Sequence, residues 1–290
     1  MTIDLPQFSA LLKRVFDSWL DDDVQSLGAA LAYYTLFSLA PLLLIVIAVA
    51  GLVFGQEAAR GEIEQQLRAL MGEPGAGAVQ ALLASVGKPS ESSLATLVGV
   101  VLLLIGATTV FGELQSALDR IWRVPSAVPV SGWLNLIRAR LLSFGMILVI
   151  GFLLMVSLVL SAALATMERF WSPLFGGWIT IASASNAAAG FALVTAMFAL
   201  IYKVMPRARV EWRDVWTGAL FTALLFSLGK ALIGVYIGRS GIVTAFGAAG
   251  SLVVVLLWVY YSAQIFLIGA EFTWVYANMF GSRKSLKPVT

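Results

Sequence analysis

The chain has 290 residues and a formal net charge of +3; 60% of its residues are hydrophobic and 12% are charged. Soluble domains carry about 25% charged residues, so this composition excludes a soluble globular protein and indicates an integral membrane protein. The absence of cysteine, of histidine and of a GxxxxGK(S/T) loop excludes disulfides, thiol or histidine catalysis and a P-loop ATPase. We therefore expect no catalytic residue, no metal and no cofactor.

Residues 1–27 are predicted to form an amphipathic segment on the cytoplasmic side. Between residues 5 and 20 the apolar side chains recur at helical spacing. They are Leu5, Phe8, Leu11, Leu12, Val15, Phe16 and Trp19. Two interpretations stay open, namely a helix that lies on the membrane surface and a helix that packs beneath the bundle.

Six apolar runs are long enough to cross a bilayer, which requires about 20 residues each. They are Ala29–Phe54, Leu94–Phe111, Leu141–Ala165, Ile179–Tyr202, Val215–Tyr236 and Leu252–Phe272. The sequence therefore predicts an all-α polytopic protein, with residues 1–290 forming a single membrane domain of six transmembrane helices.

The distribution of basic residues predicts the orientation of these spans. Thirteen lysines and arginines fall on one side of the predicted membrane and five on the other, with Lys230 inside the fifth run. The thirteen are Lys13, Arg14, Arg120, Arg123, Arg138, Arg140, Lys203, Arg207, Arg209, Arg213, Arg283, Lys284 and Lys287. Because cytoplasmic loops are enriched in basic residues, both termini, including the tail at 281–290, are predicted to be cytoplasmic.

Residues 55–93 form the largest predicted loop and fall on the opposite, extracytoplasmic side. Apolar residues at helical spacing before and after the sequence Gly72-Glu73-Pro74-Gly75 predict two short amphipathic helices that are separated at this point.

Charged residues in the apolar runs are the first candidates for a substrate or ion pathway, because a charge at the bilayer centre costs about 2.5–3.5 kcal/mol on insertion scales. Glu113, Lys203 and Glu271 are predicted to lie at similar depth near the cytoplasmic ends of their spans. A Glu–Lys–Glu cluster and three separate interfacial residues are both compatible with this placement. Glu271 is the stronger candidate, because an apolar run continues beyond it. Lys230 is predicted near the outer interface, where it can extend into water or meet Asn186.

Polar groups and a proline in the apolar runs are further candidates. Pro41 lies near the middle of the first run and frees the Phe37 carbonyl, for which Ser38, Tyr33 and Tyr34 are candidate partners. Broken helices build binding sites in many transporters, although a simple packing kink is the commoner outcome. Gln264 adds a polar group to the sixth run. Two small-residue motifs, Gly51-xxx-Gly55 and Gly234-xxx-Gly238, allow close approach of helices.

Three segments together resemble the YihY/BrkB family of bacterial inner-membrane proteins over about residues 10–280. They are GAALAYYTLFSLAPLLLI from Gly28, ELQSALDRIW from Glu113 and LWVYYSAQIFLIGAEF from Leu257. In the family pattern an Asn often stands where this chain has Asp119. The resemblance implies six spans, cytoplasmic termini and a place in the bacterial inner membrane. Members were once labelled ribonucleases, and transport of lipid-like or amphiphilic molecules has been suggested for relatives.

We expect a transporter or translocator of a lipid-like or amphiphilic substrate without its own ATPase. The alternative is a non-transporting scaffold for envelope assembly. An intramembrane enzyme or a ribonuclease is the least favoured reading, since Asp21, Asp22 and Asp23 are consecutive and point in different directions on a helix. Membrane lipids are the expected partners, self-association stays open, and no nucleic-acid partner is expected.

Overall fold

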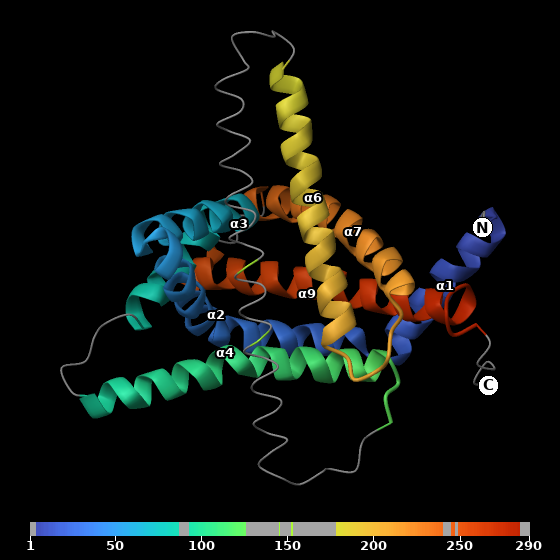
Figure 1. The fold of residues 1–290 in the computed structure, drawn as a ribbon, viewed down its shortest axis with the longest axis horizontal. Coiled ribbons are helices and arrows are strands. Elements are labelled where there is room, and N and C mark those ends of the chain that lie inside the picture. Colours follow the sequence, from blue (N-terminus) through green and yellow to red (C-terminus); the bar gives the residue numbers. More distant parts are fainter. Residues whose placement is uncertain are drawn as a thin grey trace.

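The computed structural model describes residues 4–86, 93–125, 145, 152, 178–239, 245–246 and 249–284. Within these ranges the secondary structure is helical and no strand occurs (Figure 1). The long helices are α1 (Leu5–Asp21), α2 (Val24–Phe54), α3 (Gln56–Val86), α4 (Ser93–Ile121), α6 (Trp178–Val204), α7 (Trp212–Arg239) and α9 (Gly250–Met279).

Four stretches of these helices are long and apolar enough to cross a membrane. They are Val24–Leu52 in α2, Ala187–Val204 in α6, Trp212–Ile237 in α7 and Gly250–Met279 in α9. The predicted second run coincides with part of α4, whereas the predicted third run, Leu141–Ala165, lies almost entirely outside the described residues. The all-α class is confirmed for the described ranges, and the number of six spans stays a prediction.

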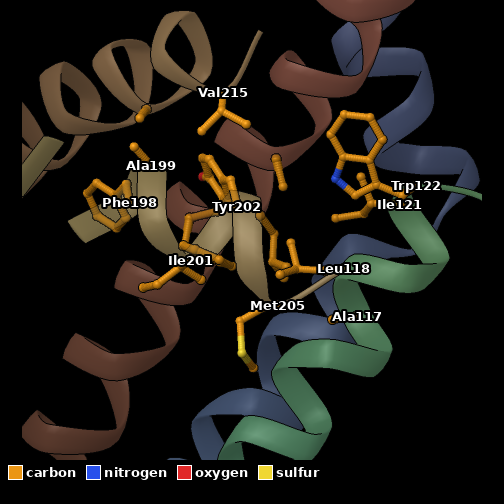
Figure 2. Close-up of a cluster of buried hydrophobic side chains, with 14 of the residues drawn as sticks. Ala117, Leu118, Ile121, Trp122, Phe198, Ala199, Ile201, Tyr202, Met205 and Val215 are labelled. Carbon is orange, nitrogen blue, oxygen red and sulfur yellow. The ribbon is translucent and has the colours of Figure 1, made fainter. Parts of the chain in front are cut away.

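Helix α9 lies at the centre of the described bundle and packs against α7, α2, α3 and α1 (Figure 1). Its C-terminal half, the ends of α4 and α6 and the start of α7 share one large apolar core. Figure 2 shows part of this core, with Tyr202 of α6 between Val215 of α7 and Leu118 of α4. We call this end of the bundle, where α1 also lies, the α1 end, and the opposite end the α3 end.

Glycine–threonine pairs bring α7 and α9 into close contact. A Cβ on Gly218 of α7 would overlap the side chain of Thr273 of α9, and a Cβ on Gly269 of α9 would overlap the side chain of Thr222 of α7. Each threonine donates a 2.7 Å hydrogen bond to the carbonyl of the glycine four residues earlier in its own helix. The buried Tyr202 hydroxyl, 3.0 Å from the Thr222 hydroxyl, donates to the Phe266 carbonyl at 2.7 Å. The glycines thus permit the close approach of α7 and α9, and the buried hydroxyl groups at this contact form hydrogen bonds with backbone carbonyls.

Helix α1 confirms the predicted N-terminal helix and has two apolar stripes. Leu11 and Val15 are buried against Phe272 and Val275 of α9. A second stripe at spacing of four is exposed instead; it consists of Phe8, Leu12, Phe16 and Leu20. The helix therefore packs on the bundle, as the second interpretation predicted, and it also presents an apolar stripe; contact of this stripe with the membrane surface stays a prediction.

Helix α3 is kinked at the position predicted from the sequence. Gly72 has φ of 73°, a conformation that favours glycine, and Pro74 follows it. Proline lacks an N–H and therefore leaves the carbonyl four residues earlier, that of Leu70, without its helical partner. The indole N–H of Trp258 in α9 donates to this carbonyl at 2.8 Å. The kink thus provides the acceptor that fixes α3 to α9.

Candidate functional site

Glu271 of α9 is the most isolated buried charge-bearing group in the described part of the chain. Its side chain is 0% exposed, and neither of its carboxylate oxygens has a hydrogen-bond partner among the described residues. An ionised carboxylate without partners is costly to bury, so this arrangement needs a compensating proton, cation or ligand.

The electrostatic neighbours of Glu271 come from the connection between α1 and α2 and from the end of α4. Its charged neighbours are Asp22, Asp21 and Arg123. One oxygen of Asp22 is buried and has no partner within the described ranges. Two ionised carboxylates are both acceptors, so a hydrogen bond between them requires one proton on the pair. The arrangement can therefore hold a proton between Asp22 and Glu271.

Local backbone geometry places the members of this cluster. Asp23 has φ of 52° and Arg123 has φ of 50°, left-handed conformations that are uncommon outside glycine. The first lies in the connection between α1 and α2, and the second lies in the turn after α4. Both positions hold polar side chains at the α1 end, next to the last turns of α9.

Tryptophan side chains from α1, the end of α4 and α9 lie at the α1 end of the bundle. The indole nitrogens of Trp19 and Trp122 are buried and have no acceptor among the described residues. The Arg123 guanidinium lies 4.3 Å from the ring centre of Trp274, and that of Arg283 lies 4.9 Å from the ring centre of Trp122. These cation–π contacts hold positive charge over apolar surface near the acidic residues.

Gln264 lies two turns before Glu271 on α9 and contacts the start of α2. Its Nε2 donates to the carbonyls of Val24 and Gln25 at 3.3 Å each, and its Oε1 is buried without a partner in the described ranges. A Cβ on Gly28 would overlap the Gln264 amide, so glycine at this position leaves room for the side chain of Gln264. The structure thus brings two predicted residues, Gln264 and Glu271, to residues 22–25 of the chain.

The other predicted charged residues lie elsewhere. Lys203 donates to the carbonyl of Val210 and lies 5.4 Å from the ring centre of Trp212, in the connection between α6 and α7. Glu113 is half-buried on α4, and in the described part of the chain no ion pair joins it or Glu271 to Lys203. Lys230 is exposed on α7. The side chain of Asn186 lies outside the described residues, and so does its predicted contact with Lys230.

The candidate residues around Pro41 do not form one site either. Helix α2 continues through Pro41, which approaches α4 closely, since a Cβ on Gly106 would lie 3.2 Å from Pro41 Cγ. The Ser38 side chain is buried, whereas Tyr33 and Tyr34 are exposed on the surface of α2. A packing contact thus accompanies the proline, and a pathway role of the two tyrosines stays a prediction.

Two aspartates that sequence reasoning did not select fix the loops of the α1 end. Asp214 in the first turn of α7 is fully buried and accepts hydrogen bonds from the Ser282 hydroxyl at 2.6 Å and the Ser282 N–H at 3.2 Å. Asp119 accepts the Arg207 N–H at 2.7 Å, and its other oxygen lies 3.5 Å from the Arg207 guanidinium. The only sequence signal was an acidic residue beside a helix end, which is common at surfaces.

Replacing Asp119 tests this anchoring. Asp119→Asn is expected to change the free energy of unfolding by less than about 1 kcal/mol, because an amide oxygen still accepts the Arg207 N–H and the guanidinium of the lost ion pair is exposed to solvent. Asp119→Ala is expected to cost about 1–2 kcal/mol, because it removes the acceptor as well. Thermal unfolding of the two purified variants measures the difference, and equal losses would contradict the assignment.

A metal site has no support in the described ranges, where no group of three acidic side chains could hold an ion. Long apolar helices with acidic groups buried at one end define the chain as a polytopic integral membrane protein.

The chain belongs to the BrkB family, because the family model described as "Virulence factor BrkB" matches residues 15–290. This confirms the resemblance inferred from the three sequence segments.

Relatives of the chain are named as UPF0761 membrane proteins. That of Pseudomonas paraeruginosa is 30% identical over 269 residues, which cover 91% of this chain and 61% of the relative. That of Alteromonas mediterranea is 27% identical over 282 residues, which cover 97% of this chain and 92% of the relative. This chain thus spans about three fifths of the Pseudomonas relative and nearly all of the Alteromonas one. No solved structure shows significant similarity to the chain.

Proposed function

We propose that the protein is a proton-coupled translocator of a lipid-like or amphiphilic substrate and that Glu271 and Asp22 carry the proton. The observation that supports this most strongly is the burial of Glu271 beside Asp22 without a partner for either of its oxygens. Ionisable residues inside transmembrane helices commonly form proton relays and ion pathways, and a purely structural helix has no need of one.

The coupling follows from the chemistry of the pair. With one proton, the two carboxyl groups form a neutral hydrogen-bonded unit together with the Arg123 charge nearby; without it, two negative charges repel in an apolar setting. Protonation therefore changes the interaction between α9 and the connection of α1 to α2. A transporter needs such a switch, in which binding of the coupling ion favours one of two packings.

The proposed orientation places the α1 end at the cytoplasm of a bacterial inner membrane. The described residues nearest the two chain ends lie together at this end (Figure 1). The basic residues Lys13, Arg14, Arg207 and Arg283 are also at this end, in agreement with the enrichment of basic residues in cytoplasmic loops. Both termini in the cytoplasm and six spans complete the proposal.

Translocation in reconstituted vesicles tests the function. The full chain is placed in dioleoylphosphatidylcholine vesicles with traces of fluorescent phosphatidylglycerol, phosphatidylethanolamine or lysophosphatidic acid, and dithionite quenching reports the fraction in the outer leaflet. We expect a pH gradient to redistribute at least one of these lipids only when protein is present. Redistribution of none, with folded protein in the membrane, would refute the proposal and favour the scaffold.

A further inference from the structure

A cavity of about 310 Å³ lies between α2 and α3, remote from the acidic pair. Its apolar wall comes from Leu44 and Ile47 of α2 and from Ile63, Leu67 and Leu83 of α3. Ligand pockets range from about 300 to 1,000 Å³, so this cavity is at the lower limit. It has room for about ten groups the size of water or of a methylene, which suits one hydrocarbon chain.

One side of the same cavity is polar, with Arg60, Glu64 and Gln80. Gln80 and Arg68 hold the pKa of the Glu64 carboxyl below its usual range by hydrogen bonding, so that Glu64 is ionised. Arg68 Nη2 lies 2.6 Å from Glu64 and its Nη1 lies 2.8 Å from Glu73, so these two carboxylates share one guanidinium. Arg60 is exposed and makes no ion pair in the described ranges.

We propose that this cavity binds a single-chain anionic amphiphile, with its hydrocarbon between Leu44, Ile47 and Ile63 and its head group on Arg60. A guanidinium that makes no ion pair in the described ranges, beside an apolar cavity wall, can bind a carboxylate or phosphate at the end of a hydrocarbon chain, because arginine binds both anions through paired N–H groups. An alkylammonium of the same length cannot form this pairing with Arg60. This amphiphile is the substrate class of the proposed translocator, so its role as a substrate rests on the proposed function.

The kink of α3 fixes the position of the α3 wall of the cavity. Gly72 and Pro74 interrupt the helix, and Trp258 of α9 holds the segment before the kink through the Leu70 carbonyl. The part before the kink carries Arg60 and Ile63, and the part after it carries Gln80 and Leu83. The contact of Leu70 with the central helix α9 thus lies between the two parts of α3 that line the cavity.

Photolabelling of the full chain tests binding. The protein is reconstituted in dioleoylphosphatidylcholine vesicles and exposed, without any pH gradient, to a fatty acid, a lysophosphatidic acid or an alkylammonium, each with a diazirine in a chain of equal length. We expect saturable labelling of residues 44–47 and 60–84 by at least one anionic probe, and the probe that saturates at lower concentration identifies carboxylate or phosphate. Equal labelling by the ammonium probe, or no saturable labelling, would overturn the inference.

Matched variants locate the site. Arg60→Gln is expected to raise the half-saturating concentration about fivefold, as for an exposed ion pair worth about 1 kcal/mol. Arg239→Gln removes an exposed arginine at the C-terminal end of α7. This variant is expected to leave the half-saturating concentration unchanged. Ala84→Trp fills the cavity and is expected to reduce labelling, whereas Ala58→Trp on the exposed surface of α3 is not. Identical binding by Arg60→Gln and Arg239→Gln would refute the site.

The design separates this inference from the proposed function, because labelling needs no translocation. Saturable labelling in a protein that moves no lipid would support the cavity and refute transport. Gradient-driven movement of lipid without saturable labelling would support transport and refute the cavity.

Discussion

Glu271→Gln is expected to reduce lipid movement driven by a pH gradient to the level of protein-free vesicles. The variant keeps the shape of the side chain but cannot bind and release a proton, so the gradient loses its point of coupling. The protein is expected to remain folded, because a neutral amide is less costly to bury than a carboxylate. Dithionite quenching at several pH values, with size-exclusion chromatography as the folding check, measures both effects.

Two neighbouring aspartates provide a matched comparison for this result. Asp22→Asn removes the acidic neighbour of Glu271 and is expected to shift the pH dependence of movement, because Glu271 then no longer faces a second carboxylate. Asp23→Asn makes the same change on an exposed residue. Asparagine tolerates the left-handed backbone conformation of this position, so the variant is expected to behave as the wild type. A Glu271→Gln protein with wild-type rates across pH would refute the role of Glu271.

Among the substitutions considered, Gly269→Ala is expected to lower the free energy of unfolding most, by about 2–3 kcal/mol, as is typical when an extra group is forced into a packed interior. Its Cβ would overlap the Thr222 side chain and lie 2.6 Å from the Tyr202 hydroxyl. Both groups are buried and hydrogen-bonded, and their displacement also weakens the bond from Tyr202 to the Phe266 carbonyl. Thermal unfolding of the purified protein in detergent measures the loss.

A double-mutant cycle shows whether the contact with Thr222 is the cause. In Gly269→Ala combined with Thr222→Ala, part of the loss is expected to be recovered, because the overlapping hydroxyl is gone. Gly234→Ala on α7 is the control, since no atom of the described residues lies within 4 Å of its Cβ position. Additive effects of the two substitutions, or an equal loss in Gly234→Ala, would contradict close packing at Gly269.

The sequence was sufficient for the features that depend on local pattern. Helical spacing of apolar residues predicted α1, and the glycine–proline pair at Gly72 and Pro74 predicted the kink of α3. Glu271 could be selected because an acidic residue inside an apolar run is costly. The small-residue motif at Gly234 was less informative, because the close contacts of α7 and α9 use Gly218 and Gly269 instead.

The partners of Glu271 could not be predicted in the same way. Asp22 belongs to three consecutive aspartates that point in different directions on a helix, and the packing of α1 on α9 places it beside Glu271. Depth along the membrane suggested Lys203 instead, but its amino group lies in the connection between α6 and α7. Equal depth does not specify which faces of two helices meet, and that choice depends on side-chain packing across the whole bundle.

Proton movement that accompanies substrate movement tests the coupling directly. Vesicles that contain a pH-sensitive dye and the reconstituted protein are given a gradient of lysophosphatidic acid at equal pH on both sides. The wild type is expected to change the internal pH, whereas Glu271→Gln vesicles are expected to match protein-free ones. An equal pH change in wild-type and Glu271→Gln vesicles would contradict the assignment of the proton to the Asp22–Glu271 pair.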